Sequence, residues 1–380
     1  MCVLLAGLAG AQEHVSEALT FLVTNQAVNT GSIARDTAAA EATSRTIGQA
    51  LLASLATLPV TSTSGAFSYR LNPALGTVER STQTFGPVFA ERALTSGAGS
   101  ASVGLGFQHL RFTALDGQQL RDGTLVTTAN RFADEAVPFD VDAVTLALDA
   151  DVMTGYVNLG LGSRVDVAVA APVIWLRMDG TRVNTYRGQT FTQARVSSRA
   201  IGLADLLVRS KVSLFQEDGL GVAAGFDIRL PTGRERDLLG AGRTAVRVSA
   251  IGSAEGDRTS VHASVGLGVG GLARELTYSA AVSTALSPSV TLSAEALGRW
   301  TGLPGDIVLA AQPHPTLAGV DTLRLVPGTS HLQSLMLGPG VKWNLSDTWV
   351  VVAQAGVPMM KGGLRAPVLP FIGLEYSVAR

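Results

Sequence analysis

The chain has 380 residues, of which 46% are hydrophobic and only 16% are charged, whereas an average soluble domain is roughly 25% charged. Its formal net charge of -1 gives no general attraction to nucleic acid, so we expect neither DNA nor RNA as a partner. Charged or strongly polar residues interrupt every hydrophobic run after the first dozen residues, which excludes a spanning helix. Any membrane-spanning unit of this chain is therefore expected to be a strand.

Export is predicted by residues 1–11, MCVLLAGLAGA, an apolar run that ends in the small residues Ala9, Gly10 and Ala11. Such a run is typical of a signal peptide, with cleavage after Ala11. The usual positively charged beginning is missing, so we expect the recorded start of the signal to be truncated. A buried apolar run that stays on the protein is the alternative. Cys2, the single cysteine, leaves no internal disulfide and no multi-cysteine metal site.

Residues 12–64 are predicted to form a helical segment. An apolar stripe at helical spacing runs along it and ends at a proline: Ile47, Leu51, Leu55, Leu58 and Pro59. The bridging stretch at residues 65–97 carries turn-forming residues and is predicted to be a short hairpin or a plug. Because a helix with an apolar stripe must dock somewhere, we hypothesise that residues 13–92 enter or cap the periplasmic mouth of a barrel and limit flux.

Residues 98–380 are predicted to form that barrel, because side chains there alternate between two kinds with a period of two. One clear apolar face is Leu220, Val222, Ala224, Phe226, Ile228 and Leu230. The opposite face is small and charge-poor, and several strands reach the roughly ten residues that cross a bilayer obliquely. Unpaired backbone groups in lipid are costly, so the sheet must close. The predicted fold class is all-β: a transmembrane antiparallel up-and-down β-barrel of about 12 strands (range 12–14), with an α-helical N-terminal segment.

The connections alternate in length, as they do in bacterial outer-membrane barrels with short periplasmic turns and longer outer loops. Short links are expected at residues 162–164, 217–219, 255–258, 287–289 and 346–348. Long links are expected at residues 115–140, 179–199, 232–243, 301–330 and 358–367, and the short link at 271–275 is an exception. Aromatic residues lie where the two membrane interfaces would be: Trp175 and Trp300 at the outer one, and Phe215, Trp343, Trp349 and Tyr376 at the inner one. The predicted location is the bacterial outer membrane.

Charged residues on the polar face are candidates for lining the lumen: Asp205, Arg209, Lys211, Asp227, Arg229, Arg247, Glu295 and Arg299, together with Asp166, Glu275, Lys342 and Glu375. The two signs are balanced, which argues against a strongly ion-selective lining. Asp205 and Arg209 are predicted to form a cross-strand network with Asp227 and Arg229. Structural ion pairing is the plainer interpretation of this set, and guidance of a substrate is the alternative.

No catalytic residue, metal site or cofactor is predicted. Gly266, Gly268 and Gly271 have the G-x-G-x-x-G spacing of a dinucleotide-binding loop, but they lie in an alternating strand pattern with no helix after it. A G-x-S-x-G nucleophile motif is absent, and the five histidines lack metal-ligand spacing. The chain is therefore not expected to be an enzyme. A membrane hydrolase that pairs His262 with a serine of a neighbouring strand is the remaining alternative.

Three stretches resemble the outer-membrane proteins grouped under the meta-cleavage (MetA) pathway of phenol degradation: VDVAVAAPVIWLRMDG (165–180), AGFDIRLPTGRERDLLGAGR (224–243) and LMLGPGVKWNLSDTWVVVAQAGVPM (335–359). The resemblance covers the chain from about Val141 to its end. It implies an outer-membrane transporter barrel whose partners are membrane lipid and small, often hydrophobic or aromatic, solutes. It supplies no catalytic or binding residues to carry over. Barrels of this kind favour a C-terminal aromatic residue, whereas this chain ends in Ala379-Arg380, so Tyr376 is expected to take that role.

The function predicted from the sequence is therefore a channel or transporter for passive uptake or efflux of small solutes. The alternative is a closed-lumen barrel that acts as an interaction or structural protein through its outer loops, above all residues 301–330. The sequence specifies neither the solute nor the oligomeric state.

Overall fold

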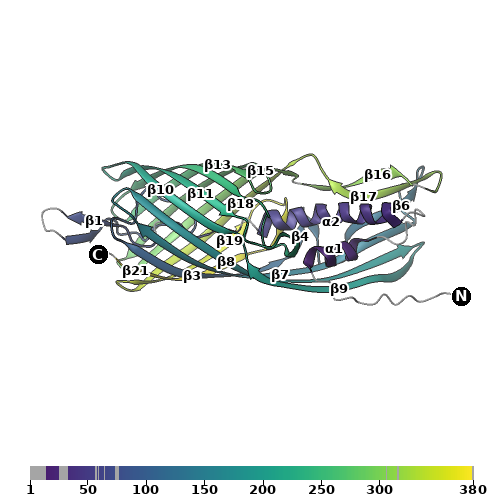
Figure 1. Cartoon of the computed structure of the whole chain (residues 1–380), viewed down its shortest axis with the longest axis horizontal. Coiled ribbons are helices and arrows are strands. Elements are labelled where there is room, and N and C mark those ends of the chain that lie inside the picture. Colours follow the sequence, from purple (N-terminus) through teal and green to yellow (C-terminus); the bar gives the residue numbers. More distant parts are fainter. Residues whose placement is uncertain are drawn as a thin grey trace.

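The computed structural model describes residues 14–24, 33–55, 58, 60–63, 65–72, 77–304, 306–314 and 316–378, and the predicted signal peptide lies outside them. Two α-helices come first in the described chain, α1 (Val15–Val23) and α2 (Ile33–Leu55). Neither of these helices is both long and apolar enough to cross a bilayer. Figure 1 shows that they lie beyond one end of a β-barrel, beside strands that continue past it.

Twelve antiparallel strands close into this barrel, which confirms the predicted fold class and strand number. Around the ring they are β7 (Asp140–Gly160), β3 (Ala101–Phe112), β21 (Leu369–Val378), β19 (Trp349–Pro358), β18 (His331–Ser346), β15 (Val290–Pro304), β14 (Glu275–Ser287), β13 (Thr259–Gly270), β12 (Ala245–Glu255), β11 (Leu220–Leu230), β10 (Leu206–Glu217) and β8 (Val165–Tyr186). The pairing of β8 with β7 closes the ring. No edge of the barrel is therefore left unpaired in the bilayer, as lipid requires.

The turns of the barrel are short at one end and mostly long at the other, where the turn at residues 271–274 is the short exception that the sequence predicts. The short ones span residues 161–164, 218–219, 256–258, 288–289 and 347–348, close to where the sequence predicts them. The first barrel strand begins and the last one ends at this same end, where Ala101 pairs with Val378. In the usual orientation of bacterial barrels, the short-turn end faces the periplasm.

The outer surface of the barrel is apolar, as the alternation predicts. On β11, Leu220, Val222 and Phe226 are 56%, 45% and 41% exposed, while Ala223 between them is only 1% exposed. Exposed aliphatic side chains recur in the same way on the other barrel strands. Such a band would be unstable in water, and it matches the lipid-facing band of an outer-membrane barrel.

The outer membrane interface can be located on β7, because the outward side chains there change from apolar to charged. Val157 and Met153 are exposed apolar residues, whereas Asp151 and Asp149, further along the same face, are carboxylates. Asp151 accepts hydrogen bonds from His109 at 2.6 Å and from Arg177 at 2.5 Å. Trp175 lies directly opposite Asp151 on β8, at the interface where the sequence predicts it.

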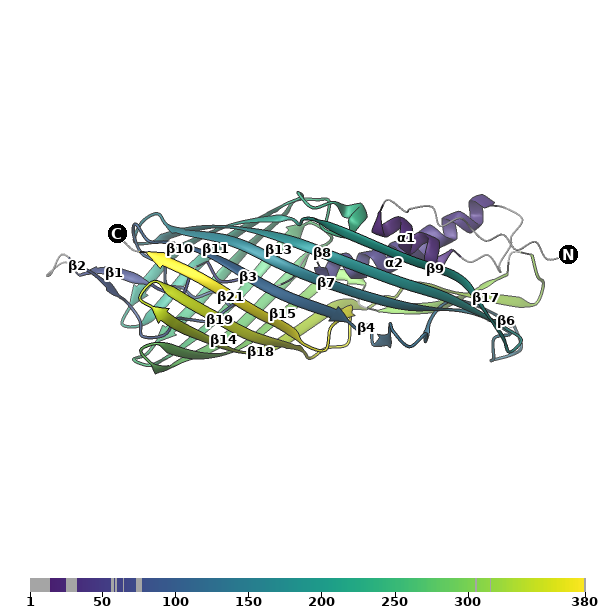
Figure 2. The ribbon, with the colours of Figure 1, turned by 90° about the horizontal axis from the view of Figure 1, so that it is seen from below.

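Beyond this interface the sheet continues as a curved, open surface that we name the half-cup. It consists of the outer parts of β7 and β8 together with β6 (Leu125–Phe132), β9 (Gln189–Leu203), β16 (Ile307–Pro313) and β17 (Val320–Pro327). Figures 1 and 2 show the half-cup extending far past the barrel and holding both helices on its inner side. The prediction of a loop at residues 179–199 is therefore wrong. The hairpin of β8 and β9 continues there because inward side chains such as Leu176 and Met178 have the helices to pack against.

The helices also lie at the mouth opposite to the predicted one. α1 packs on β8 and β9, and α2 packs on β17 and on β20 (Leu364–Arg365), all of which belong to the long-loop end. Leu19, Leu22 and Leu51 are buried there against aliphatic side chains of the half-cup. The helix stripe needs an apolar partner, and the inner face of the half-cup provides one that the polar lumen cannot.

The loop between β11 and β12 ties α1 to the barrel. It contains the short 3₁₀ helix η1 (Glu235–Asp237), and His14, which precedes α1, lies 3.1 Å from the Asp237 carboxylate. Arg234 donates to the same carboxylate at 2.5 Å. Burial acts to raise the pKa of Asp237, but the hydrogen bonds from Arg234 and His14 outweigh it and hold that pKa below its ordinary value.

Short strands complete the fold at both ends. β1 (Tyr69–Asn72) and β2 (Thr77–Arg80) form a hairpin that projects from the short-turn end in Figure 1. β4 (Ala114–Leu115), β5 (Gln118–Gln119) and β20 form a small sheet at the long-loop end. The described part of the chain therefore starts with helices at the long-loop end and reaches the short-turn end before its first barrel strand.

Candidate functional site

Between the helices and the first barrel strand, the described chain runs through the lumen of the barrel. Residues 60–63, 65–68 and 81–97, which we name the plug, run inside the barrel and are interrupted only by the β1–β2 hairpin and Ser64. The described part of the plug contains neither helix nor strand. Its backbone N–H and C=O groups are nevertheless mostly buried, so they need hydrogen-bond partners from elsewhere.

Glu295 of β15 supplies the largest group of these partners. Its carboxylate accepts hydrogen bonds from three successive backbone N–H groups of the plug, those of Val88, Phe89 (3.0 Å) and Ala90 (2.8 Å). The Glu295 residue is only 3% exposed. Hydrogen bonds from three donors to one charged acceptor are strong in a buried environment that water does not reach, so Glu295 anchors the plug.

Two further carboxylates bind the plug in the same way. Asp166 of β8 accepts the backbone N–H of Ser96 at 3.0 Å on both of its oxygens. Glu375 of β21 accepts the N–H of Ala66 at 2.6 Å and the hydroxyl of Tyr156 at 3.2 Å. The acidic side chains of the lumen thus replace the acceptors that secondary structure would provide.

Basic side chains satisfy the carbonyl groups of the plug. Lys211 donates to the backbone oxygens of Arg92 at 3.1 Å and Leu94 at 2.7 Å. Lys342 donates to the oxygen of Phe85 at 3.0 Å. Arg209 donates to the oxygen of Thr61 at 3.0 Å and lies 3.1 Å from the carboxylate of Glu91.

An apolar cluster adds to these polar anchors. Phe67, Phe85 and Phe89 of the plug pack with Val350, Val352 and Phe371 of the barrel wall. The Arg80 guanidinium lies 4.9 Å and 4.8 Å from the ring centres of Phe67 and Phe85. The plug therefore fills the periplasmic half of the lumen as a small core of its own.

The pair Lys211 and Asp166 offers a test of this arrangement, because the two charges lie 3.5 Å apart with side chains 1% and 0% exposed. Lys211→Met is expected to destabilise the protein by about 3 to 5 kcal/mol, since it leaves a buried carboxylate without its cation. The double variant Lys211→Met with Asp166→Asn should lose less, because neither charge remains. Urea unfolding in lipid vesicles would measure both, and strictly additive losses would contradict the coupling.

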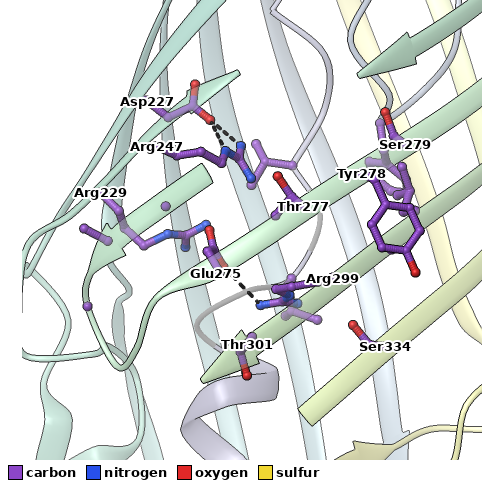
Figure 3. A pocket seen from close by; sticks show the side chains of 18 of the residues that line it. Asp227, Arg229, Arg247, Glu275, Thr277, Tyr278, Ser279, Arg299, Thr301 and Ser334 are labelled. Atoms are coloured by element: carbon purple, nitrogen blue, oxygen red, sulfur yellow. Dashed lines mark hydrogen bonds and ion pairs between the residues drawn. The ribbon is translucent and has the colours of Figure 1, made fainter. Parts of the chain in front are cut away.

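A cavity of about 340 Å³ lies on the long-loop side of the plug. Its floor includes Phe89 and Glu91, and the end of the helical segment, with Ala53 and Leu58, also borders it. Figure 3 shows Arg229, Arg247 and Arg299 projecting into this space from three strands.

Only part of the predicted network exists in the cavity wall. Arg209 and Asp227 pair across β10 and β11 at 3.6 Å, and Arg247 donates to Asp227 at 3.1 Å. Asp205, however, accepts the backbone N–H groups of Gly233 and Ala241 in the β11–β12 loop. Asp205 therefore takes no part in the pairing with Arg209. β10 begins only at Leu206, so Asp205 lies in the connection between β9 and β10 and not in the strand that carries Arg209.

The predicted lumen residues thus divide into two groups with different partners. Asp166, Lys211, Glu295, Lys342 and Glu375 hold the plug, whereas Asp227, Arg229, Arg247, Glu275 and Arg299 line the cavity. Arg209 and Lys211 belong to both groups, because each contacts the plug and also lines the cavity. Our sequence reasoning missed Glu91, which binds Arg209 and the N–H of Thr63 at 3.0 Å. The sequence did contain a feature that points to Glu91, because Glu91-Arg92 is an isolated charged pair in the otherwise apolar stretch FGPVFAERA.

His262 does lie beside serines, as the hydrolase alternative requires. Its ring nitrogens are 2.8 Å from the Ser253 hydroxyl and 3.0 Å from the Ser260 hydroxyl. Ser253 also accepts the N–H of Ala93, and Ser260 contacts Thr84, both from the plug. The cluster is sealed beneath the plug and does not border the cavity, so its hydrogen bonds serve packing. Among the residues that the structure describes, no group of three or more His, Cys, Asp or Glu side chains could hold a metal.

A closed antiparallel barrel with an apolar outer band, an aromatic residue at the membrane interface and a charged lumen is a porin-like β-barrel of the bacterial outer membrane. More particularly, the chain belongs to the family described as "Putative MetA-pathway of phenol degradation", which matches residues 127–358. The family resemblance seen in the sequence is therefore confirmed.

Solved structures of outer-membrane proteins are similar to this chain. The COG4313 outer membrane channel from Pseudomonas putida F1 is 11% identical, with a TM-score of 0.49 over 75% of this chain and 98% of that one. The KdgM porin is 9% identical, with a TM-score of 0.37 over 73% and 99%. The outer membrane protease OmpT from Escherichia coli is 8% identical, with a TM-score of 0.31 over 73% and 97%. No curated protein sequence matches the chain.

Proposed function

We propose that this protein is a gated passive channel for small organic solutes. The observation that carries the proposal is the cavity of about 340 Å³, which is closed toward the periplasm by the plug. A solute entering from the long-loop side would rest on Phe89 and Glu91 and would pass only when the plug moves. The link of the family to phenol degradation supports a small aromatic or hydrophobic solute.

The way in which the plug is held supports its movement. Its described contacts to the wall are hydrogen bonds, the ion pair of Glu91 with Arg209 and apolar contacts, without a strand pairing or a covalent link. Water can replace each of these hydrogen bonds when the plug leaves, so the free energy needed to open the plug is smaller than the sum of their strengths in the closed state. A segment fixed in this way can open locally while the barrel stays intact.

A disulfide between the plug and the wall tests the proposal. A Cβ atom placed on Gly221 of β11 would lie 3.1 Å from the Cβ of Ala93 in the plug. A shift of a few tenths of an ångström brings the two atoms to the roughly 3.5 to 4.5 Å that a disulfide requires. We expect the Ala93→Cys, Gly221→Cys variant, made with Cys2→Ser, to conduct several-fold less in planar bilayers when oxidised than when reduced. The disulfide would hold the plug in the lumen, and reduction would free it.

The two single-cysteine variants are the matched controls and should not respond to the redox state. Equal conductance of the oxidised and reduced double variant would contradict the plug as a gate. Absence of conductance in both states would favour the alternative function, a closed barrel that binds partners through its outer surface.

A further inference from the structure

A row of charged side chains crosses the outer surface of the protein just beyond the lipid-facing band. It runs over four neighbouring strands, and each residue lies directly opposite the next: Arg111 of β3, Asp149 of β7, Arg177 of β8 and Arg199 of β9. Figure 2 shows these strands side by side along one flank of the molecule. We name these four residues the arginine row, because three of them are arginines.

One end of the arginine row places two positive charges side by side. Arg177 and Arg199 lie directly opposite each other, although like charges in that position destabilise a sheet. Asp151 accepts a hydrogen bond from Arg177 at 2.5 Å, but it also accepts one from His109 at 2.6 Å. Arg199 is exposed and makes neither a hydrogen bond nor an ion pair with another described residue. An anion from outside the protein would remove the repulsion at this end.

The other end of the row also lacks carboxylates. Arg111 lies opposite Asp149, but the Asp149 carboxylate accepts its hydrogen bond from Arg121 at 2.7 Å. Asp179, the next outward carboxylate on β8, forms no ion pair within the described part of the chain. Arg111 is exposed and has no hydrogen-bond or ion-pair partner among the described residues. The guanidiniums at both ends of the row are therefore available to an outside anion.

Below the arginine row, toward the bilayer, the surface is apolar. Four residues nearer the membrane on each strand lies a second row of opposed side chains: Phe107, Met153, Val173 and Leu203. Phe107, Met153 and Leu203 are 44%, 39% and 39% exposed. The two rows are about 13 Å apart along the strands, because a strand rises about 3.3 Å per residue. An amphipathic lipid can therefore contact both rows, with its chains on the apolar one and its headgroup on the arginines.

The arginine row is confined to one side of the barrel. On strands β11 to β14, the outward residues nearest the outer mouth are aliphatic: Leu230, Val246, Val269 and Leu276. A general requirement of the membrane interface would place arginines around the whole barrel. Their restriction to β3, β8 and β9 indicates one bound molecule.

We propose that the arginine row binds lipopolysaccharide, the glycolipid of the outer leaflet, through the phosphates of its lipid A anchor. Lipid A carries a phosphate at each end of a disaccharide, and its acyl chains would pack on Phe107, Met153 and Leu203. Arg111 and Arg199 are three strand spacings apart, about 14 Å in all, so the two ends of the row can contact both phosphates. The planar fork of each guanidinium donates two hydrogen bonds to a phosphate. This site is independent of the solute that the channel carries.

Native mass spectrometry of the full-length protein in detergent micelles tests the inference with three lipids: diphosphorylated lipid A, lipid A without its phosphates, and phosphatidylglycerol. Diphosphorylated lipid A is expected to bind at one site at least about tenfold more tightly than either of the others, as for hydrogen bonds between charged groups. Equal binding of the phosphate-free lipid would overturn the inference. Equal binding of phosphatidylglycerol would reduce the row to a surface for any anionic lipid and would overturn it as well.

The double variant Arg111→Gln, Arg199→Gln should weaken binding of diphosphorylated lipid A about tenfold or more and leave the phosphate-free lipid unchanged. The matched control is Arg164→Gln, Arg258→Gln, because these exposed arginines lie in short turns at the periplasmic end. It removes the same charge and should bind lipid A like the native protein. An equal loss in both double variants would show that net charge attracts the lipid and would overturn the inference. If the row variant does not fold, the comparison of the three lipids on the native protein still decides.

Discussion

Glu295→Ala is expected to release the plug from the barrel wall. The variant leaves the backbone N–H groups of Val88, Phe89 and Ala90 without their acceptor in a buried place, at a cost of about 3 to 5 kcal/mol. Because the barrel strands remain paired, we expect the loss to appear as local opening of the plug. Deuterium exchange of the peptide that covers residues 84–97 should accelerate by about 150-fold to 5,000-fold, as that free energy implies.

Glu275→Ala is the control for this experiment. Glu275 is also a carboxylate of the lumen face, but it borders the cavity and contacts Arg299, not the plug. Exchange in the plug peptide should therefore stay at the native rate in this variant. Equal acceleration in both variants would mean that lumen charge in general, and not the three hydrogen bonds to Glu295, holds the plug.

Ala224→Arg is expected to destabilise the barrel by about 2 to 4 kcal/mol, the usual effect of a charge on the lipid face near the bilayer midplane. Ala224 lies midway along β11, between the exposed residues Val222 and Phe226. Reversible unfolding from lipid vesicles would measure the difference. A change below about 0.5 kcal/mol would show that this face does not meet lipid.

Ala147→Arg is the matched control for Ala224→Arg. It introduces the same side chain at an outward-facing position that lies outside the bilayer. Ala147 belongs to β7 beyond the interface at Asp151, and it lies directly opposite Asp179 of β8. An arginine there would meet water and a carboxylate, so we expect a change within about 0.5 kcal/mol. A large loss at Ala147 would move the membrane interface further out along β7.

The sequence alone was sufficient for the barrel because the barrel is built from local rules. A period of two assigns each strand residue to one face, so Leu220 and Asp227 could be placed outside and inside without any knowledge of neighbours. Short turns between such strands fix the antiparallel order and the end at which the barrel closes. The family resemblance and the location in the outer membrane follow from the same stretches.

The sequence pattern did not predict that β7 and β8 continue past the membrane. Even-numbered residues of β7 face inward along its whole length, yet the inward residues are polar in the barrel, as at Asn158, and aliphatic in the half-cup, as at Leu146. The surroundings of each face determine which residues are stable there. The outer face meets lipid or water, and the inner face meets the plug or a helix. Only the packing of the helices against residues more than a hundred positions away supplies those surroundings.

The partners of the lumen charges were likewise decided by tertiary structure. Alternation places both Glu295 and Glu275 on the inner face, but it does not distinguish an anchor of the plug from a residue of the cavity. Glu295 binds N–H groups some 205 to 207 positions earlier in the chain. Asp205, which the sequence pattern had placed in a network with Arg209, similarly lies before the start of β10 and binds backbone N–H groups of the β11–β12 loop. Hydrogen bonds and ion pairs depend on distances of a few ångströms, and periodicity fixes a face but not the neighbour across it.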